Sequence, residues 1–134
     1  MDAIDTVTAK IELVMQCRKA GVPLISSMGA GNKLDPTKFC VTDIFKTRTD
    51  PLAKVMRREL RKRGVKKLKV VYSEAEPVTP VKSDETSGVP SDSHSASRRA
   101  IPGSTAFVPS VAGLIIASEV IKDLTKEYER TENG

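Results

Sequence analysis

The fold of this 134-residue chain is indicated by its first ten residues, Met1-Asp-Ala-Ile-Asp-Thr-Val-Thr-Ala-Lys10, in which an acidic turn runs directly into an amphipathic helix. In α/β proteins, a carboxylate between the end of a strand and the start of a helix lies at the edge of the sheet where ligands bind. This junction already falls at Asp5. We therefore expect most of the strand that precedes it, and the first half of a nucleotide-binding fold, to lie upstream.

Hydrophobic periodicity and turn residues predict three helices, at 6–20, 51–63 and 109–128, and three short strands, at 23–27, 39–45 and 67–73. The second helix has the clearest ends, because Asp50 can cap it, Pro51 suits its first position and Gly64 can terminate it. The pattern predicts an α/β fold with a short mixed sheet and flanking helices. The last helix is expected to bury an apolar stripe made of Val111, Leu114, Ile115, Ile121 and Leu124.

Residues 74–103 differ in composition from the rest, with four prolines, six serines and few apolar side chains. Such a stretch has little to bury, so we expect a flexible crossover loop. The chain then divides into three parts: residues 1–73 of the nucleotide-binding α/β fold, the crossover at 74–103, and a returning segment with the last core helix at 104–134.

The composition is that of a soluble globular protein, with 39% hydrophobic and 29% charged residues. No signal peptide or membrane span is indicated, and a reducing cytoplasm is expected. Cys17 and Cys40 are 23 residues apart, with His94 as the single histidine, so neither a zinc site nor a disulfide framework is predicted. The scarcity of aromatic residues argues against RNA binding by base stacking.

Positive charge is concentrated between Lys46 and Lys69. This segment contains eleven of the 22 Lys and Arg residues and only two acids, Asp50 and Glu59. Such a cluster is typical of a surface that binds a phosphate-rich partner. A solvated helix face explains it equally well, and both interpretations stay open. The residues expected to point outward are Lys54, Arg57, Arg58, Arg61 and Lys62.

Two short motifs are candidates for chemistry. Acids such as Asp2 and Asp5 are favoured at a helix start by the helix dipole, and capping is the preferred explanation. The alternative is that Asp5 holds a magnesium ion on nucleotide phosphates. Gly29 and Gly31 follow a predicted strand and could approach an anion, but they lack the third glycine of a dinucleotide fingerprint, so a tight turn is preferred.

Several segments in a fixed order carry a more specific signal. The segments 2–10 (beginning Asp-Ala-Ile-Asp), 25–31 (Ile-Ser-Ser-Met-Gly-Ala-Gly), 34–37 (Leu-Asp-Pro-Thr), 41–44 (Val-Thr-Asp-Ile), 46–53 (Lys-Thr-Arg-Thr-Asp-Pro-Leu-Ala) and 103–113 together resemble the ThiF/MoeB/HesA superfamily of ubiquitin-activating-type adenylating enzymes. The resemblance covers nearly the whole chain apart from the crossover. It is strongest to the tRNA-modifying dehydratases of this superfamily.

The resemblance implies a Rossmann-like adenylating fold that binds ATP and Mg and transfers AMP to a carboxylate. In the dehydratases that carboxylate belongs to the threonylcarbamoyl group of a modified tRNA adenosine, and its activation lets it cyclise. Asp5 matches the magnesium- and phosphate-facing aspartate, and Lys10 matches a basic position that is usually Arg. Gly29 and Gly31 would lie in a loop on the substrate side. tRNA would be a partner, with Lys54, Arg57, Arg58, Arg61 and Lys62 as candidate contacts, and a homodimer is implied.

The superfamily's glycine-rich nucleotide loop and its ribose- and phosphate-binding residues precede the segment matched here. We therefore expect this chain to be the C-terminal half of such an enzyme, without tight ATP binding or activity alone. Two alternatives stay open: an activating enzyme (a ligase) for a ubiquitin-like sulfur carrier protein, and a non-catalytic nucleic-acid-binding module. The absence of cysteine from 74–103 argues against a thioester mechanism.

Overall fold

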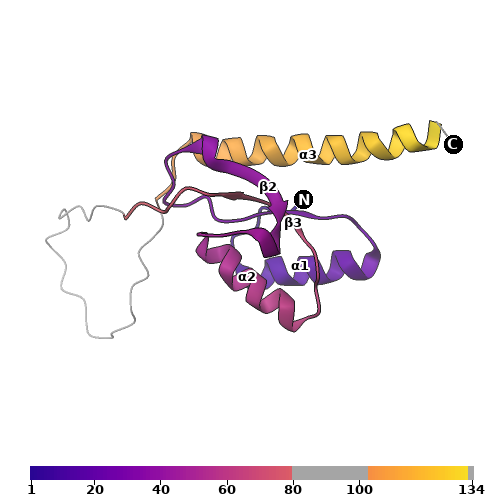
Figure 1. Ribbon diagram of the computed structural model, residues 1–134, viewed down its shortest axis with the longest axis horizontal. Helices are drawn as coiled ribbons and strands as arrows, with labels where there is room; N and C mark the ends of the chain where they lie inside the picture. The colour runs from indigo at the N-terminus through magenta and orange to yellow at the C-terminus, as the bar shows by residue number, and fades with distance from the viewer. Residues whose placement is uncertain (80–102, 133–134) are drawn as a thin grey trace, which may run out of the picture.

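The computed structural model describes residues 1–79 and 103–132 (Figure 1). Its elements, in chain order, are α1 (Val7–Ala20), β1 (Ile25–Ser27), the 3-10 turn η1 (Pro36–Lys38), β2 (Phe39–Asp43), the 3-10 turn η2 (Ile44–Lys46), α2 (Pro51–Lys62), β3 (Lys69–Ser73) and α3 (Phe107–Glu132). The predicted short mixed sheet with flanking helices is confirmed.

The sheet has the order β1-β3-β2, with β1 parallel and β2 antiparallel to β3. The N-terminal segment extends it by one residue. Asp2 pairs with Ser26 in a parallel bridge, donating from its amide to the Ile25 carbonyl and accepting from the Ser27 amide. The acidic turn therefore lies beside β1, at one edge of the sheet.

Helices cover both faces of the sheet, with α1 and α2 on one side and α3 on the other (Figure 1). The residues of β3 alternate accordingly. Val70 and Tyr72 belong to the core shared with α1 and α2, whereas Val71 packs with Ile25 against Ala112 and Ile116 of α3. The structure is thus three layers thick, and its parallel strands end beside the starts of α1 and α3.

The predicted element ends agree with the structure wherever the local signal is strong. Asp50 caps α2 through a hydrogen bond from the Ala53 amide, and Pro51 is its first residue. Gly21 and Gly64 follow α1 and α2 with positive φ angles of 68° and 67°, a backbone conformation that favours glycine. All three strands are shorter than predicted. β1 and β3 begin two residues later, at Ile25 and Lys69, and β2 ends at Asp43 because residues 44–46 form a 3-10 turn.

The expected orientation of the last helix is only partly right: Ile115 of the predicted stripe packs on the core against the sheet and Val111 is half-buried, but the other three residues are not buried. Its buried residues are Val108, Ala112 and Ile116, whereas Leu114, Ile121 and Leu124 of the predicted stripe are exposed. The helix also begins at Phe107, two residues before the predicted start, and continues to Glu132. Both faces carry apolar side chains, so periodicity alone could not tell which face packs on the sheet.

Most of the predicted crossover, and His94 within it, lies outside the described residues. None of the helices described is both long enough and apolar enough to cross a membrane.

Candidate functional site

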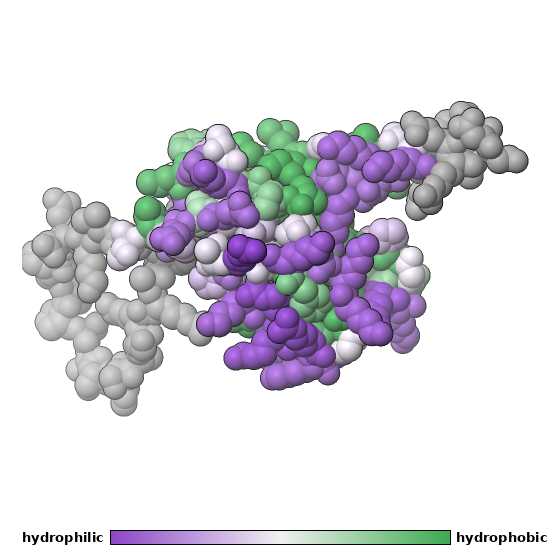
Figure 2. Space-filling model, in the orientation of Figure 1, coloured by the Kyte–Doolittle hydropathy of each residue, from purple (hydrophilic) through white to green (hydrophobic). Residues whose placement is uncertain are grey.

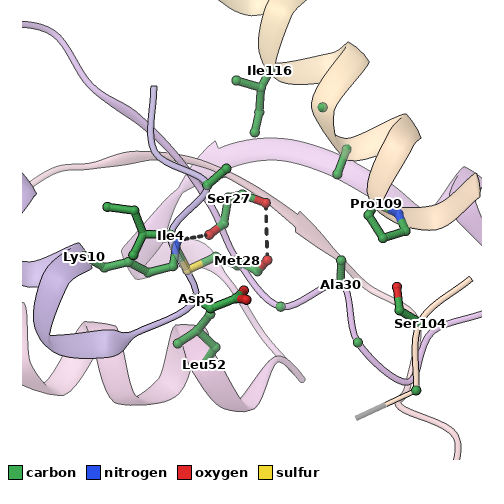
Figure 3. A pocket seen from close by; sticks show the side chains of 16 residues that line it. Ile4, Asp5, Lys10, Ser27, Met28, Ala30, Leu52, Ser104, Pro109 and Ile116 are labelled. Carbon is green, nitrogen blue, oxygen red and sulfur yellow. Dashed lines mark hydrogen bonds between the residues drawn. The ribbon is translucent and has the colours of Figure 1, made fainter. Parts of the chain in front are cut away.

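A pocket of about 710 Å³ opens where β1 ends, between the start of α1 and the first turns of α3 (Figure 3). Its position beyond the carboxyl end of a parallel strand is where open α/β sheets bind ligands, and its size is typical of small-molecule sites. Four residues predicted from the sequence line it: Asp5, Lys10, Gly29 and Gly31. The remaining lining residues are Ala3, Ile4, Ser27, Met28, Ala30, Leu52, Gly103, Ser104, Pro109, Ala112, Gly113 and Ile116.

Lys10 forms a buried ion pair at one wall of this pocket. Its Nζ lies 3.1 Å from Oδ2 of Asp2, and the two side chains are 2% and 0% exposed. The same ammonium donates to the Ser27 carbonyl, while Asp2 also accepts from the Ser26 hydroxyl and the Ile4 amide. Lys10 therefore has a fixed place, and its partner is Asp2 rather than the Asp5 expected to share its site.

Asp5 is exposed and lies in the same turn, at the mouth of the pocket (Figure 3). The helix cap expected of the two acids falls instead to Thr6, whose side chain makes no capping hydrogen bond. In the part of the chain that the structure describes, no three or more Asp, Glu, His or Cys side chains are grouped to hold a metal.

The glycine turn at 29–31 is packed against the start of α2. A Cβ atom added at Gly29 would lie 3.1 Å from Oδ2 of Asp50, so only glycine fits there without displacement of the capping carboxylate. Asp50 is 2% exposed, and its Oδ2 has no hydrogen-bond partner among the described residues. The predicted tight turn is thus present, and close packing explains its first glycine.

The two residues after this turn hold it to the rest of the pocket. Asn32 has a φ of 57° and binds Gly103 through both its amide and its side-chain oxygen, and its carbonyl accepts from Val78. The buried Lys33 ammonium donates to the carbonyls of Ser73 and Ala75. Burial lowers the pKa of Lys33, and the Asp50 carboxylate partly opposes that shift.

Sequence reasoning missed Asp2, Asn32 and Lys33 as parts of this site. Asp2 was interpreted only as a helix-capping acid, and no local pattern pairs it with Lys10. For Asn32, the only local signal was the tolerance of asparagine for positive φ. Nothing in the surrounding sequence marked Lys33 as a buried lysine.

The basic residues of α2 differ in their exposure and contacts, although the sequence suggested that all of them point outward. Arg57 is half-buried and donates to the carbonyl and the hydroxyl of Thr47, so it holds the loop before the helix. Arg61 lies over the Phe45 ring, 5.3 Å from its centroid. Arg63, Lys62 and Arg58 surround Glu59 and, in that order of effect, lower its pKa to about 2. Lys54 is exposed, and with Arg58, Arg61 and Lys62 it forms an outward cationic surface.

The cysteines fit the expected packing roles. Both Cys17 and Cys40 are half-buried free thiols. Cys40 lies opposite Tyr72 in the β2–β3 pair, and burial raises the pKa of the Cys40 thiol. Burial, with a hydrogen bond from the hydroxyl to Glu74, raises the pKa of Tyr72 to about 12.

Comparison with known proteins identifies close relatives. No protein-family model matches the chain. The chain is 48% identical to the tRNA threonylcarbamoyladenosine dehydratase of Bacillus subtilis over 131 residues, which cover 96% of this chain and 51% of that protein. The Escherichia coli dehydratase is 46% identical over 61 residues, covering 46% of this chain and 23% of that protein.

A solved structure of the E. coli dehydratase in complex with ATP superposes with a TM-score of 0.77 at 30% identity, covering 96% of this chain and 48% of that one. The chain spans about half the length of the two relatives that it matches from end to end. The predicted resemblance is therefore confirmed: the chain is similar to tRNA threonylcarbamoyladenosine dehydratases of the ThiF/MoeB type, and it corresponds to about half of such a protein.

Proposed function

We propose that this chain is the C-terminal half of an ATP-dependent tRNA threonylcarbamoyladenosine dehydratase and forms one side of its nucleotide and substrate site. The observation that carries the proposal is the 48% identity over 96% of the chain, combined with a pocket beyond β1 that gathers Asp5, Lys10 and the glycine turn. The three parts expected at 1–73, 74–103 and 104–134 would be segments of this enzyme rather than independent units.

ATP would supply an adenylyl group that makes a carboxylate oxygen a good leaving group, so that the activated carbonyl can be attacked within the same molecule. The chain's own contribution would be positioning. Asp5 would face the magnesium-bound phosphates, Lys10 would hold the end of β1 in place, and the Gly29–Gly31 backbone would border the substrate. The pocket fits this assignment, since a single exposed carboxylate beside backbone amides suits a cation that is shared with phosphate oxygens.

Isothermal titration with ATP and magnesium tests this assignment. We expect no tight binding by the 134-residue chain, and binding once it is joined to the half of the B. subtilis dehydratase that it does not match. Asp5→Asn in the joined protein should weaken magnesium-dependent binding, whereas Glu12→Gln, an exposed acid on α1, should not. Tight binding by the chain alone, or an unchanged Asp5→Asn variant, would contradict the assignment.

We also propose that the outward cationic surface of α2 contacts the tRNA backbone. Arg57 is a poor test residue because it holds the Thr47 loop, so the informative variant is Arg58→Glu with Arg61→Glu and Lys62→Glu. It should weaken tRNA binding and flatten its dependence on salt, because fewer counterions are released. Reversal of Lys19, Lys122 and Lys126, which lie on other helices, is the matched control. Equal effects of the two triple variants would exclude a specific surface.

The same measurements separate a second candidate, the non-catalytic nucleic-acid module, which the basic cluster on α2 favours. That module would bind tRNA through α2 whether or not ATP binds to the joined protein.

We further propose that the complete protein is a cytoplasmic homodimer. Support for self-association comes from the exposed apolar residues of α3.

A further inference from the structure

Asn32, directly after the glycine turn, binds both of the stretches of chain that flank the predicted crossover. Its carbonyl oxygen accepts from the Val78 amide at 2.7 Å, on the stretch that follows β3. Its amide donates to the Gly103 carbonyl at 2.8 Å, and its Oδ1 accepts from the Gly103 amide at 2.7 Å. Two stretches that are far apart in the sequence are therefore attached to a single residue.

The conformation of Asn32 explains how one residue can make these three bonds. Its φ of 57° lies in the left-handed region, which asparagine adopts more readily than most residues that carry a side chain. The backbone carbonyl is directed at Val78, and the side-chain oxygen serves the Gly103 amide. Glycine would fit this backbone but lacks the side-chain acceptor, whereas aspartate has both properties. The three bonds together therefore favour an asparagine or an aspartate at this position.

The segment 103–106, which leads into α3, has few other means of fixing its position. α3 itself is held by apolar packing, and Figure 2 shows hydrophobic side chains along the upper part of the molecule, where Figure 1 places α3. The four residues of the segment, Gly-Ser-Thr-Ala, carry no large apolar side chain. The Thr105 hydroxyl is buried without a hydrogen-bond partner among the described residues. Within the same residues, the hydrogen bonds that attach the segment outside α3 are the two between Gly103 and Asn32.

This segment forms part of the wall of the candidate pocket. Gly103 and Ser104 line the pocket together with the glycine turn that precedes Asn32. In Figure 3, Ser104 lies toward α3, whereas Asp5 lies toward the start of α1. Ser104 is exposed, so this wall is open to a ligand. A shift of Gly103 away from Asn32 would move the wall and change the shape of the pocket.

We propose that Asn32 is a positioning residue, whose side-chain oxygen holds Gly103 and Ser104 as the wall of the pocket that faces the threonylcarbamoyl group of the tRNA substrate. The inference rests on the function proposed above and adds a residue to its site. The wall offers an uncharged hydroxyl and backbone groups, which suit the hydroxyl and amide groups of that substrate better than the phosphates of ATP. Asp5, which is assigned to the phosphate side, lies away from this wall (Figure 3).

Amide exchange with solvent, measured by NMR on the 134-residue chain, tests whether Asn32 holds Gly103. Asn32→Gly permits the same backbone conformation and removes only the side-chain acceptor. The Gly103 amide should then exchange roughly 3- to 10-fold faster, because its hydrogen bond is lost. The Val78 amide should be unaffected, because it donates to a backbone carbonyl that glycine retains. The matched control is Leu34→Gly, which adds a glycine to an exposed position nearby and should change neither amide.

Two outcomes of this experiment would overturn the inference. An unchanged exchange rate at Gly103 in Asn32→Gly would show that the side chain does not hold the wall. Equal acceleration at Gly103 and Val78 would show that the variant loosens the whole region, so that the side-chain oxygen has no specific role.

Kinetics of the joined protein test what the wall does. Asn32→Gly should lower kcat/KM for threonylcarbamoyl-modified tRNA by about tenfold or more, because the substrate is no longer held in a productive position, and should leave the Kd for ATP unchanged. Asn32→Asp keeps the acceptor and should restore most of the activity, which a general loss of stability would not allow. An unchanged Asn32→Gly, or an Asn32→Asp that is equally impaired, would overturn the assignment. An inactive parent protein would contradict the proposed function, whereas the exchange rates would still decide whether Asn32 holds Gly103.

Discussion

Replacing Lys10 by methionine should remove a large part of the stability of this chain. Its ammonium and the Asp2 carboxylate are paired at 3.1 Å with exposed fractions of only 2% and 0%. Removing one partner leaves a buried charge without its counter-ion, which typically costs about 3–5 kcal/mol. Since domains of this size are stable by only about 5–15 kcal/mol, the loss would be severe.

The double variant Asp2→Asn with Lys10→Met should recover roughly half of that loss or more, because it leaves no charge unpaired. The Oδ1 of an asparagine at position 2 can still accept from the Ile4 amide, and its Nδ2, in the place of Oδ2, can donate to the Ser26 hydroxyl, which keeps the turn beside β1. Lys19→Met, a change of the same kind at the exposed end of α1, should alter stability by no more than about 0.5 kcal/mol.

Urea unfolding followed by circular dichroism measures these differences. With a slope of about 1–3 kcal/mol per molar urea, the Lys10→Met midpoint should fall by roughly 1 M or more. A Lys10→Met chain as stable as Lys19→Met would refute the reasoning, because the ion pair would then contribute nothing. A double variant as unstable as the sum of its two singles would also refute it, because the two charges would then be independent.

Two further predictions concern the glycine turn and Tyr72. Gly29→Ala should destabilise the chain, because its methyl group would lie 3.1 Å from the Asp50 carboxylate. Gly113→Ala should stabilise the chain by about 0.5–1 kcal/mol through helix propensity, since a Cβ there meets nothing within 4 Å. Thermal unfolding of the two variants measures both effects. The pKa of Tyr72 is raised to about 12 from 10.0, so its contribution to stability should be complete below pH 10 and lost between pH 10 and pH 12. Urea midpoints at pH 8 and pH 11 should therefore differ less in Tyr72→Phe than in the parent chain.

The parts of the fold that could be predicted from the sequence are those set by neighbouring residues. Asp50, Pro51 and Gly64 fixed the ends of α2 because capping and positive φ depend on local geometry. The orientation of α3 could not be predicted in this way. Its two apolar faces are equivalent in sequence, and only the shape of the sheet selects Val108, Ala112 and Ile116 for burial.

The candidate site shows the same difference between features set by neighbouring residues and features set by residues far away in the sequence. Asp5, Lys10 and the glycine turn could be assigned to the end of the sheet where the pocket lies, because they follow the end of a strand or begin a helix. The network that holds them could not, since Asp2 pairs with Ser26, a residue 24 positions away, and Lys33 reaches Ser73, 40 positions away. Long-range pairing of this kind leaves no periodicity in the sequence.

The two acids of the first turn therefore have different tasks, although they are three residues apart. Asp2 binds Ser26 and Lys10 and so fixes the turn against the end of β1. Asp5 is left exposed at the pocket, and its position depends on that buried network. A loss of ATP binding in an Asp2→Asn joined protein would therefore indicate that Asp5 is misplaced. It would not indicate that Asp2 itself contacts the nucleotide or its cation. Hydrogen exchange at Ile4 distinguishes the two causes, because its amide donates to Asp2 and loses protection only when the turn moves.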